Sequence, residues 1–92
     1  MEILEELYEI ILERKNNPRE GSYVSSLMHG GEEKILEKVE EEAGEVIEAA
    51  KTGSRDELVH EVADLLFHTL VLLGYKGIAP VEIQDELKRR RG

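Results

Sequence analysis

The sequence contains no cysteine among its 92 residues. Disulfide bonds and thiolate metal sites are therefore excluded, and a reducing compartment fits. It also lacks an apolar run of the roughly 18 residues that cross a bilayer, because His68 and Thr69 interrupt the most apolar region, Leu65 to Leu73. Its first residues are acidic from Glu2 onward, unlike the basic start of a signal peptide. We expect a soluble, cytoplasmic protein with no membrane partner.

Positive charge is scarce as well. Lysine and arginine total 12 against 21 aspartates and glutamates, which gives a formal net charge of −9. The phosphate backbones of DNA and RNA bind basic surfaces, so we expect no nucleic-acid partner. A single nucleotide remains compatible with this charge, provided that a metal ion bridges the two sets of negative groups.

Helical periodicity accounts for most of the chain. The length predicts a single domain, residues 1–92. Apolar spacing and turn residues predict a loop over residues 19–31, a turn at Gly74 and Gly77, and helices over residues 2–15, 32–51, 55–73 and 80–91. The helix over 55–73 is apolar on nearly every side, which one small domain struggles to cover. We therefore expect an all-α, compact bundle of four to five helices, completed by homodimerisation.

Two pairs of carboxylates are the most informative feature: Glu42 with Glu45, and Glu61 with Asp64. Each pair has i, i+3 spacing, which places both side chains on one face of a helix, where like charges repel. A hard cation such as Mg²⁺ offsets that repulsion directly, because oxygen atoms are its preferred ligands. Glu61 and Asp64 carry the greater weight, since their helix has little solvated face. The pattern predicts a magnesium site formed by all four carboxylates.

Residues beside the carboxylates have two interpretations each. Lys34 and Lys38 lie one turn apart on the helix of Glu42, and they either form ordinary ion pairs or neutralise the phosphates of a substrate. His68 lies one turn beyond Asp64, and it either packs in the core or orients a carboxylate. The sequence leaves both questions open.

A di-iron site is a weaker hypothesis. Glu57 and His60 have the Glu-x-x-His spacing of di-iron carboxylate bundles, but those sites need two such motifs and this chain has one. His60 is also expected to point away from the centre of the polar stripe that contains Glu61, nearer Phe67. Gly44 lies in the middle of a predicted helix, where glycine costs roughly 1 kcal/mol relative to alanine. Close approach of another helix or of a ligand would explain this glycine, and an unexplained weak point is the alternative.

The order of these residues resembles a known superfamily. Residues 38–47, KVEEEAGEVI, and residues 61–68, EVADLLFH, are similar to the Glu-Glu-x-x-Glu…Glu-x-x-Asp signature of the all-α NTP pyrophosphatase (MazG-like) superfamily. Within it the chain most resembles the phosphoribosyl-ATP pyrophosphohydrolase family, also through the Ser22-Tyr23 loop and the Gly77-Ile78 turn. The likeness covers nearly the whole chain after the first helix.

This resemblance implies an enzyme that hydrolyses phosphoribosyl-ATP to phosphoribosyl-AMP and pyrophosphate, the second step of histidine biosynthesis. It also implies a small-molecule nucleotide substrate. Carried over by position, the expected roles are Mg²⁺ ligation by Glu42, Glu45, Glu61 and Asp64, catalysis by Glu41 and Glu45, and substrate binding by Lys34, Lys38, Ser22 and Tyr23. No Ser-His or Cys-His pair suggests a covalent intermediate, which favours direct attack by water.

Two further functions remain open at this point. A house-cleaning pyrophosphatase would act on ordinary or damaged nucleoside triphosphates instead. A helical dimerisation module would use the acidic cluster only to hold a structural cation, and it would turn over no substrate.

Overall fold

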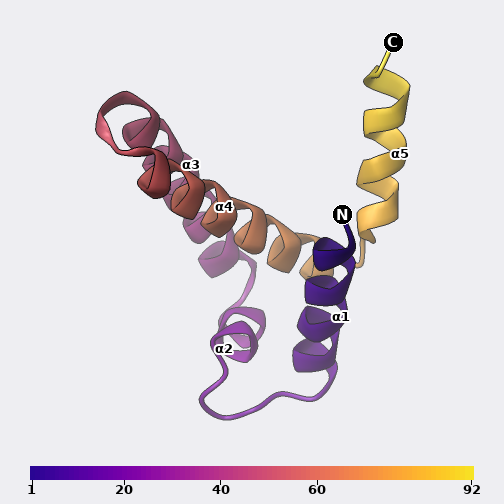
Figure 1. Cartoon of the computed structure of the whole chain (residues 1–92). Coiled ribbons are helices and arrows are strands. Elements are labelled where there is room, and N and C mark those ends of the chain that lie inside the picture. The colour runs from indigo at the N-terminus through magenta and orange to yellow at the C-terminus, as the bar shows by residue number, and fades with distance from the viewer.

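A computed structural model describes residues 1–92 as five helices with no strand (Figure 1). The helices are α1 (Glu2–Asn16), α2 (Tyr23–Gly30), α3 (Glu32–Thr52), α4 (Arg55–Lys76) and α5 (Pro80–Arg90). The all-α prediction is therefore confirmed. Helices α3 and α4 run side by side as a long hairpin whose turn lies far from α1 and α2, while α5 leaves the bundle beside the N-terminus (Figure 1).

The four predicted helices are present, and only the end of α4 differs appreciably. We expected Gly74 to lie in a turn, but it lies inside α4, which continues to Lys76. A Cβ atom on Gly74 would lie only 2.8 Å from Cγ2 of Ile11. This glycine therefore allows α1 to approach α4 closely. The helix ends at Gly77, whose φ of +72° is the left-handed conformation that glycine adopts without strain.

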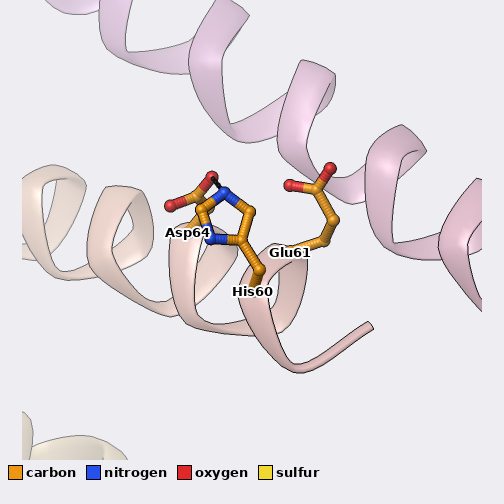
Figure 2. A group of neighbouring side chains, drawn as sticks. All are labelled: His60, Glu61 and Asp64. Atoms are coloured by element: carbon orange, nitrogen blue, oxygen red, sulfur yellow. Dashed lines mark ion pairs between the residues drawn. The ribbon is translucent and has the colours of Figure 1, made fainter. Parts of the chain in front are cut away.

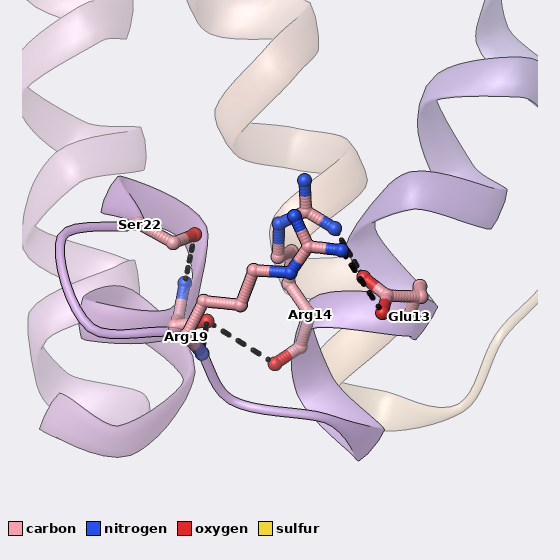
Figure 3. Close-up of polar contacts among 5 residues, drawn as sticks. Glu13, Arg14, Arg19 and Ser22 are labelled. Atoms are coloured by element: carbon pink, nitrogen blue, oxygen red, sulfur yellow. Dashed lines mark hydrogen bonds and ion pairs between the residues drawn. The ribbon is translucent and has the colours of Figure 1, made fainter.

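The loop expected over residues 19–31 was a wrong prediction, because this segment contains α2. Ser22 is the N-cap of that helix, and its hydroxyl accepts a hydrogen bond of 3.2 Å from the backbone N–H of Ser25 (Figure 3). Leu27 and Met28 then bury their side chains against the rest of the bundle. The abundance of serine and glycine concealed a capping residue followed by apolar residues at helical spacing.

The buried core lies where α1, α2, the start of α3 and the end of α4 meet. Its members are Tyr8, Ile11, Leu27, Met28, Ile35, Leu70 and Val71. A fully buried side chain of this kind contributes about 1.5–3 kcal/mol. We call this region the core end, and we call residues 44–66 the hairpin arm. In the hairpin arm only Ala49 is buried.

The turn between α3 and α4 sets how the two helices of the hairpin arm face each other. Ser54 caps α4 by accepting a hydrogen bond of 3.2 Å from the backbone N–H of Glu57. The carboxylate of Glu57 accepts a hydrogen bond from the Ser54 hydroxyl in return. Gly53 allows a close approach, since a Cβ atom there would lie 2.9 Å from the carbonyl oxygen of Ala49. Ser54 therefore fixes the start of α4.

Helix α4 is long and apolar enough to cross a membrane by length and composition, although no uninterrupted apolar run suggested this. One such helix is weak evidence, because core helices of soluble proteins meet the same criterion. Here α4 packs against both α1 and α3. The finding therefore does not indicate a membrane protein.

Candidate metal centre

The carboxylates predicted to bind metal lie on the facing sides of α3 and α4. Glu42 has only 7% of its surface exposed, yet its carboxylate takes part in no hydrogen bond and no ion pair. The carboxylate oxygens of Glu42 keep some contact with solvent, because no fully buried side-chain oxygen lacks a hydrogen-bond partner. A cation can therefore reach them, and it would offset their negative charge. The donor set around Glu42 consists of oxygen atoms, which fits a hard divalent cation.

Glu61 approaches α3 from the opposite helix (Figure 2). Its pKa is raised, first by loss of surrounding water and then by a hydrogen bond with the carboxyl group of Glu45. The negative charges of Glu45 and Glu42 raise the pKa of Glu61 further, while His60 lowers it. The structure therefore brings three of the four predicted ligands together, and they repel one another as the sequence spacing indicated.

Asp64, the fourth predicted ligand, pairs with a histidine that the sequence analysis placed elsewhere. Nε2 of His60 lies 3.3 Å from Oδ2 of Asp64 (Figure 2). His60 was expected to lie away from the stripe that contains Glu61 and Asp64, but it contacts Asp64. The i, i+4 spacing from His60 to Asp64 was the signal that could have shown this. His60, Glu61 and Asp64 offer ligand atoms that all lie within 4.8 Å of one another.

Lys38 places a positive charge at the edge of these carboxylates. Its Nζ atom lies 3.4 Å from Oε2 of Glu41, in an i, i+3 ion pair. The pKa of Lys38 is raised, first by the phenol of Tyr23 and then by Glu41 and Glu42, while burial lowers it. Lys38 therefore forms an ordinary ion pair on its own helix and also lies beside Tyr23 and Glu42.

Tyr23, at the start of α2, faces the same group of side chains. Its hydroxyl lies 2.8 Å from Nε2 of His68, a buried residue of α4. Burial raises the pKa of Tyr23; Lys38 lowers it, and the charges of Glu42, Glu41 and Asp64 raise it. The structure thus joins residues from three helices around one site. His68 is buried, as one of its two predicted interpretations required, and it also contacts Tyr23.

A model of the phosphoribosyl-ATP pyrophosphohydrolase family matches residues 4–91. The chain belongs to this family. The protein named phosphoribosyl-ATP pyrophosphatase of Geotalea daltonii is 59% identical over 91 residues, which cover 99% of this chain and 86% of the relative. Its namesake in Geobacter sulfurreducens is 58% identical over 91 residues, covering 99% and 84%.

A bifunctional histidine-biosynthesis protein of Caldanaerobacter subterraneus also matches. It is 53% identical over 90 residues, which cover 98% of this chain and 44% of that longer protein. Together these likenesses confirm the family resemblance and the prediction that the chain is a hydrolase of this family. The alternative of a non-enzymatic dimerisation module is therefore not supported.

Two predicted substrate-binding residues of this family member make other contacts. The hydroxyl of Ser22 caps α2, and Ser22 lines a polar hollow of about 340 Å³ together with Arg19 and His29. Figure 3 shows this junction, where the side chain of Arg19 also reaches Glu13 on α1. Lys34 forms no ion pair, and its stem lies next to Gly30. No contact joins Ser22 or Lys34 to the carboxylates.

Gly44 lies between the metal-ligand candidates Glu42 and Glu45 on α3. A Cβ atom added there would meet nothing within 4 Å. Close approach of another helix of this chain therefore does not explain the glycine. Gly44 leaves open space along the outer side of the hairpin arm.

Proposed function

We propose that this chain hydrolyses phosphoribosyl-ATP to phosphoribosyl-AMP and pyrophosphate with Mg²⁺ as its cofactor, in the cytoplasm, as the second step of histidine biosynthesis. Family membership supports the reaction. The single structural observation that supports the cofactor is the grouping of the Glu42, Glu45 and Glu61 carboxylates, in which the mostly buried Glu42 forms no ion pair.

The ligands in this proposal are Glu42, Glu45, Glu61 and Asp64. When bound, Mg²⁺ would neutralise charge on the phosphates and lower the pKa of a bound water. Without a cation the charges of Glu45 and Glu42 act against ionisation of Glu61, and with burial they raise its pKa. They would also repel the phosphates of a nucleotide, so this group of residues suits a nucleotide only when a cation lies between them.

The remaining residues have complementary roles. Lys38 neutralises phosphate charge, and Tyr23 contacts the substrate from α2. Hydrolysis breaks the bond between the α and β phosphates, and the attacking water gives up a proton. Glu41 and Glu45 are the two proposed acceptors of that proton. Glu45 suits this role better, because Glu41 is held in an ion pair with Lys38.

We also propose that two copies of the chain form a homodimer through α4. An exposed apolar hollow of about 350 Å³ lies on this helix, lined by Leu58, Val59, Val62, Ala63 and Leu66. Leu66 also lines a second apolar hollow, of about 390 Å³, between α1, α4 and α5. Apolar patches of this kind mark interaction sites, and a two-fold dimer places the same patch of both copies face to face.

The direct test is release of pyrophosphate from phosphoribosyl-ATP by the purified protein, with Mg²⁺ or with a chelator. ATP and other nucleoside triphosphates serve as competing substrates in parallel reactions. Glu45→Gln tests the site, and Glu40→Gln is the matched control, because Glu40 is an exposed residue of the same helix that forms no ion pair.

The proposal predicts Mg²⁺-dependent release from phosphoribosyl-ATP, a loss of at least about 100-fold in Glu45→Gln, and native activity in Glu40→Gln. Hydrolysis of nucleoside triphosphates in preference to phosphoribosyl-ATP would contradict the substrate assignment. Full activity in the presence of chelator would contradict the cofactor.

A further inference from the structure

The buried imidazole of His68 is held by two hydrogen bonds whose directions are fixed. Its Nδ1 atom lies 2.8 Å from the backbone carbonyl oxygen of Asp64, which can only accept a hydrogen bond, so Nδ1 must carry a proton. In the neutral ring Nε2 is then an acceptor. The hydroxyl of Tyr23, 2.8 Å away, therefore donates its proton to Nε2.

The bond between Tyr23 and His68 connects α2 with α4, whereas the bond between His68 and Asp64 lies within α4. Helix α2 is short, with 8 residues, and Tyr23 is its first residue. Aromatic packing supports the ring of His68 on two sides, because the rings of Phe67 and Tyr23 meet it edge to face at centroid distances of 5.4 and 5.7 Å. The ring is therefore held in one orientation.

We propose that His68 is a positioning residue that holds the side chain of Tyr23 over the carboxylate site for contact with the substrate. This inference rests on the proposed function and deepens it. His68 itself is only 5% exposed and does not reach the substrate. It acts through Tyr23, which is 48% exposed and lies near Lys38 and Glu42.

The surroundings of Tyr23 support a role in the site as well as in packing. The charges that act on its phenol come from Lys38, Glu42, Glu41 and Asp64, all of them in or beside the candidate metal centre. A tyrosine that served the core alone would bury its ring, as Tyr8 does with 7% exposure. Tyr23 instead keeps about half of its surface free for a ligand.

Three substitutions distinguish the hydrogen bond between Tyr23 and His68 from the hydrogen bond between His68 and the carbonyl of Asp64. Tyr23→Phe removes only the hydroxyl. His68→Asn keeps a donor near the position of Nδ1 for the carbonyl of Asp64, but it cannot reach Tyr23. His68→Gln places an acceptor near the position of Nε2 and keeps the bond to Tyr23. Tyr75→Phe is the matched control, because the hydroxyl of Tyr75 forms no hydrogen bond in α4.

Steady-state kinetics with phosphoribosyl-ATP provide the main measurement. Loss of one hydrogen bond that positions a substrate contact predicts a KM about 3- to 10-fold higher in Tyr23→Phe and in His68→Asn, with kcat within about twofold. The double variant Tyr23→Phe/His68→Asn is expected to match either single variant, because both remove the same bond. His68→Gln should recover most of the native KM, and Tyr75→Phe should not change it.

A merely structural role predicts a different pattern. Partial unfolding would lower the concentration of active enzyme, so apparent kcat would fall while KM stayed native. That result, or effects of Tyr23→Phe and His68→Asn that multiply in the double variant, would overturn the inference. If the native protein releases no pyrophosphate, the proposed function is contradicted. If the native protein is active and Tyr23→Phe has a native KM, this inference alone is contradicted.

The tautomer of His68 gives a test that needs no substrate. Nitrogen NMR of the imidazole in the native protein should show the neutral form protonated at Nδ1, and the resonance of Nε2 should move in Tyr23→Phe. The form protonated at Nε2 in the native protein would contradict the inference, because Tyr23 could not then donate to that atom.

Discussion

The core end and the hairpin arm of this molecule are built from the same two helices but are held in different ways. At the core end α3 and α4 are buried among apolar side chains from α1 and α2, such as Ile11 and Leu27. Along the hairpin arm the same helices have only each other, and Ala49 is the one buried residue. The acidic residues of the site lie mostly in this sparsely packed half.

The difference shows where stability and function reside. The core end supplies the buried area that stabilises the fold, and it fixes the start of α3 against the end of α4. The hairpin arm presents carboxylates on its inner side and apolar residues such as Val59 and Val62 on its outer side. We therefore expect the hairpin arm to be stabilised by two binding partners. One is a cation between the helices, and the other is a second copy of the chain packed against α4.

Two isoleucines of α3 give the sharpest test of this contrast. Ile35 at the core end is 0% exposed and Ile47 in the hairpin arm is 56% exposed. Ile35→Ala should lower the free energy of unfolding by about 2–5 kcal/mol, because it leaves a cavity in the core. Ile47→Ala should change it by no more than about 0.5 kcal/mol. Urea denaturation of both variants measures the difference, and equal losses would contradict the division into two regions.

A charged residue on the outer side of the hairpin arm tests whether a second copy of the chain binds there. Val62→Asp should weaken the proposed homodimer at least about 100-fold, since it places an unpaired carboxylate in an apolar interface. Analytical ultracentrifugation over a concentration series measures the dissociation constant. Val81→Asp is the control, because Val81 is exposed on α5 and lines neither apolar hollow. A native protein that stays monomeric, or a dimer unaffected by Val62→Asp, would exclude an interface through α4.

Two helical glycines should respond oppositely to alanine. At the core end Gly74→Ala should destabilise the fold by about 1–3 kcal/mol, because the new Cβ atom would meet Ile11. In the hairpin arm Gly44→Ala should stabilise it by roughly 1 kcal/mol, since the site is open and alanine is the better helix former. Thermal denaturation of the two variants tests both signs. Destabilisation by Gly44→Ala would show that the outer side of α3 is closely approached in the assembled protein.

The smallest predicted effect concerns the repulsion between carboxylates. The pKa of Glu61 is raised in the folded state, so its contribution to stability is present below the ordinary pKa of glutamate and is lost as the pH rises through the raised value. In chelator, Glu61→Gln should therefore gain slightly in stability relative to the native protein as the pH increases. Thermal denaturation at several pH values measures this gain. A loss of stability in Glu61→Gln that grows with pH would contradict the prediction.

Local patterns in the sequence were sufficient for most of the fold. The helix ends marked by Ser54 and Gly77 and the long amphipathic α3 follow from capping chemistry and apolar period. Helix α2 was missed because its 8 residues include serine and glycine, and its stability comes from tertiary burial of Leu27 and Met28. Likewise Gly74 could be recognised as a packing residue only once Ile11 was known to lie against it.

For the candidate site too, some contacts could be predicted from the sequence and others could not. Carboxylates on one helix face follow from i, i+3 spacing, so Glu61 and Asp64 could be paired from the sequence alone. The bond between Tyr23 and His68 could not, because 45 residues separate its partners and α2 had been taken for a loop. Contacts between helices depend on how the helices pack, and no local pattern of one helix carries that information.

The most direct test of the account is the rate of pyrophosphate release from phosphoribosyl-ATP as Mg²⁺ is titrated into Glu42→Gln and Glu40→Gln. Glu42 is a mostly buried residue whose carboxylate forms no hydrogen bond or ion pair, and Glu40 is exposed two residues away. We predict that Glu42→Gln loses at least about 100-fold of the native rate at every Mg²⁺ concentration, while Glu40→Gln follows the native curve. Equal activity of the two folded variants would show that the reaction does not depend on this carboxylate site.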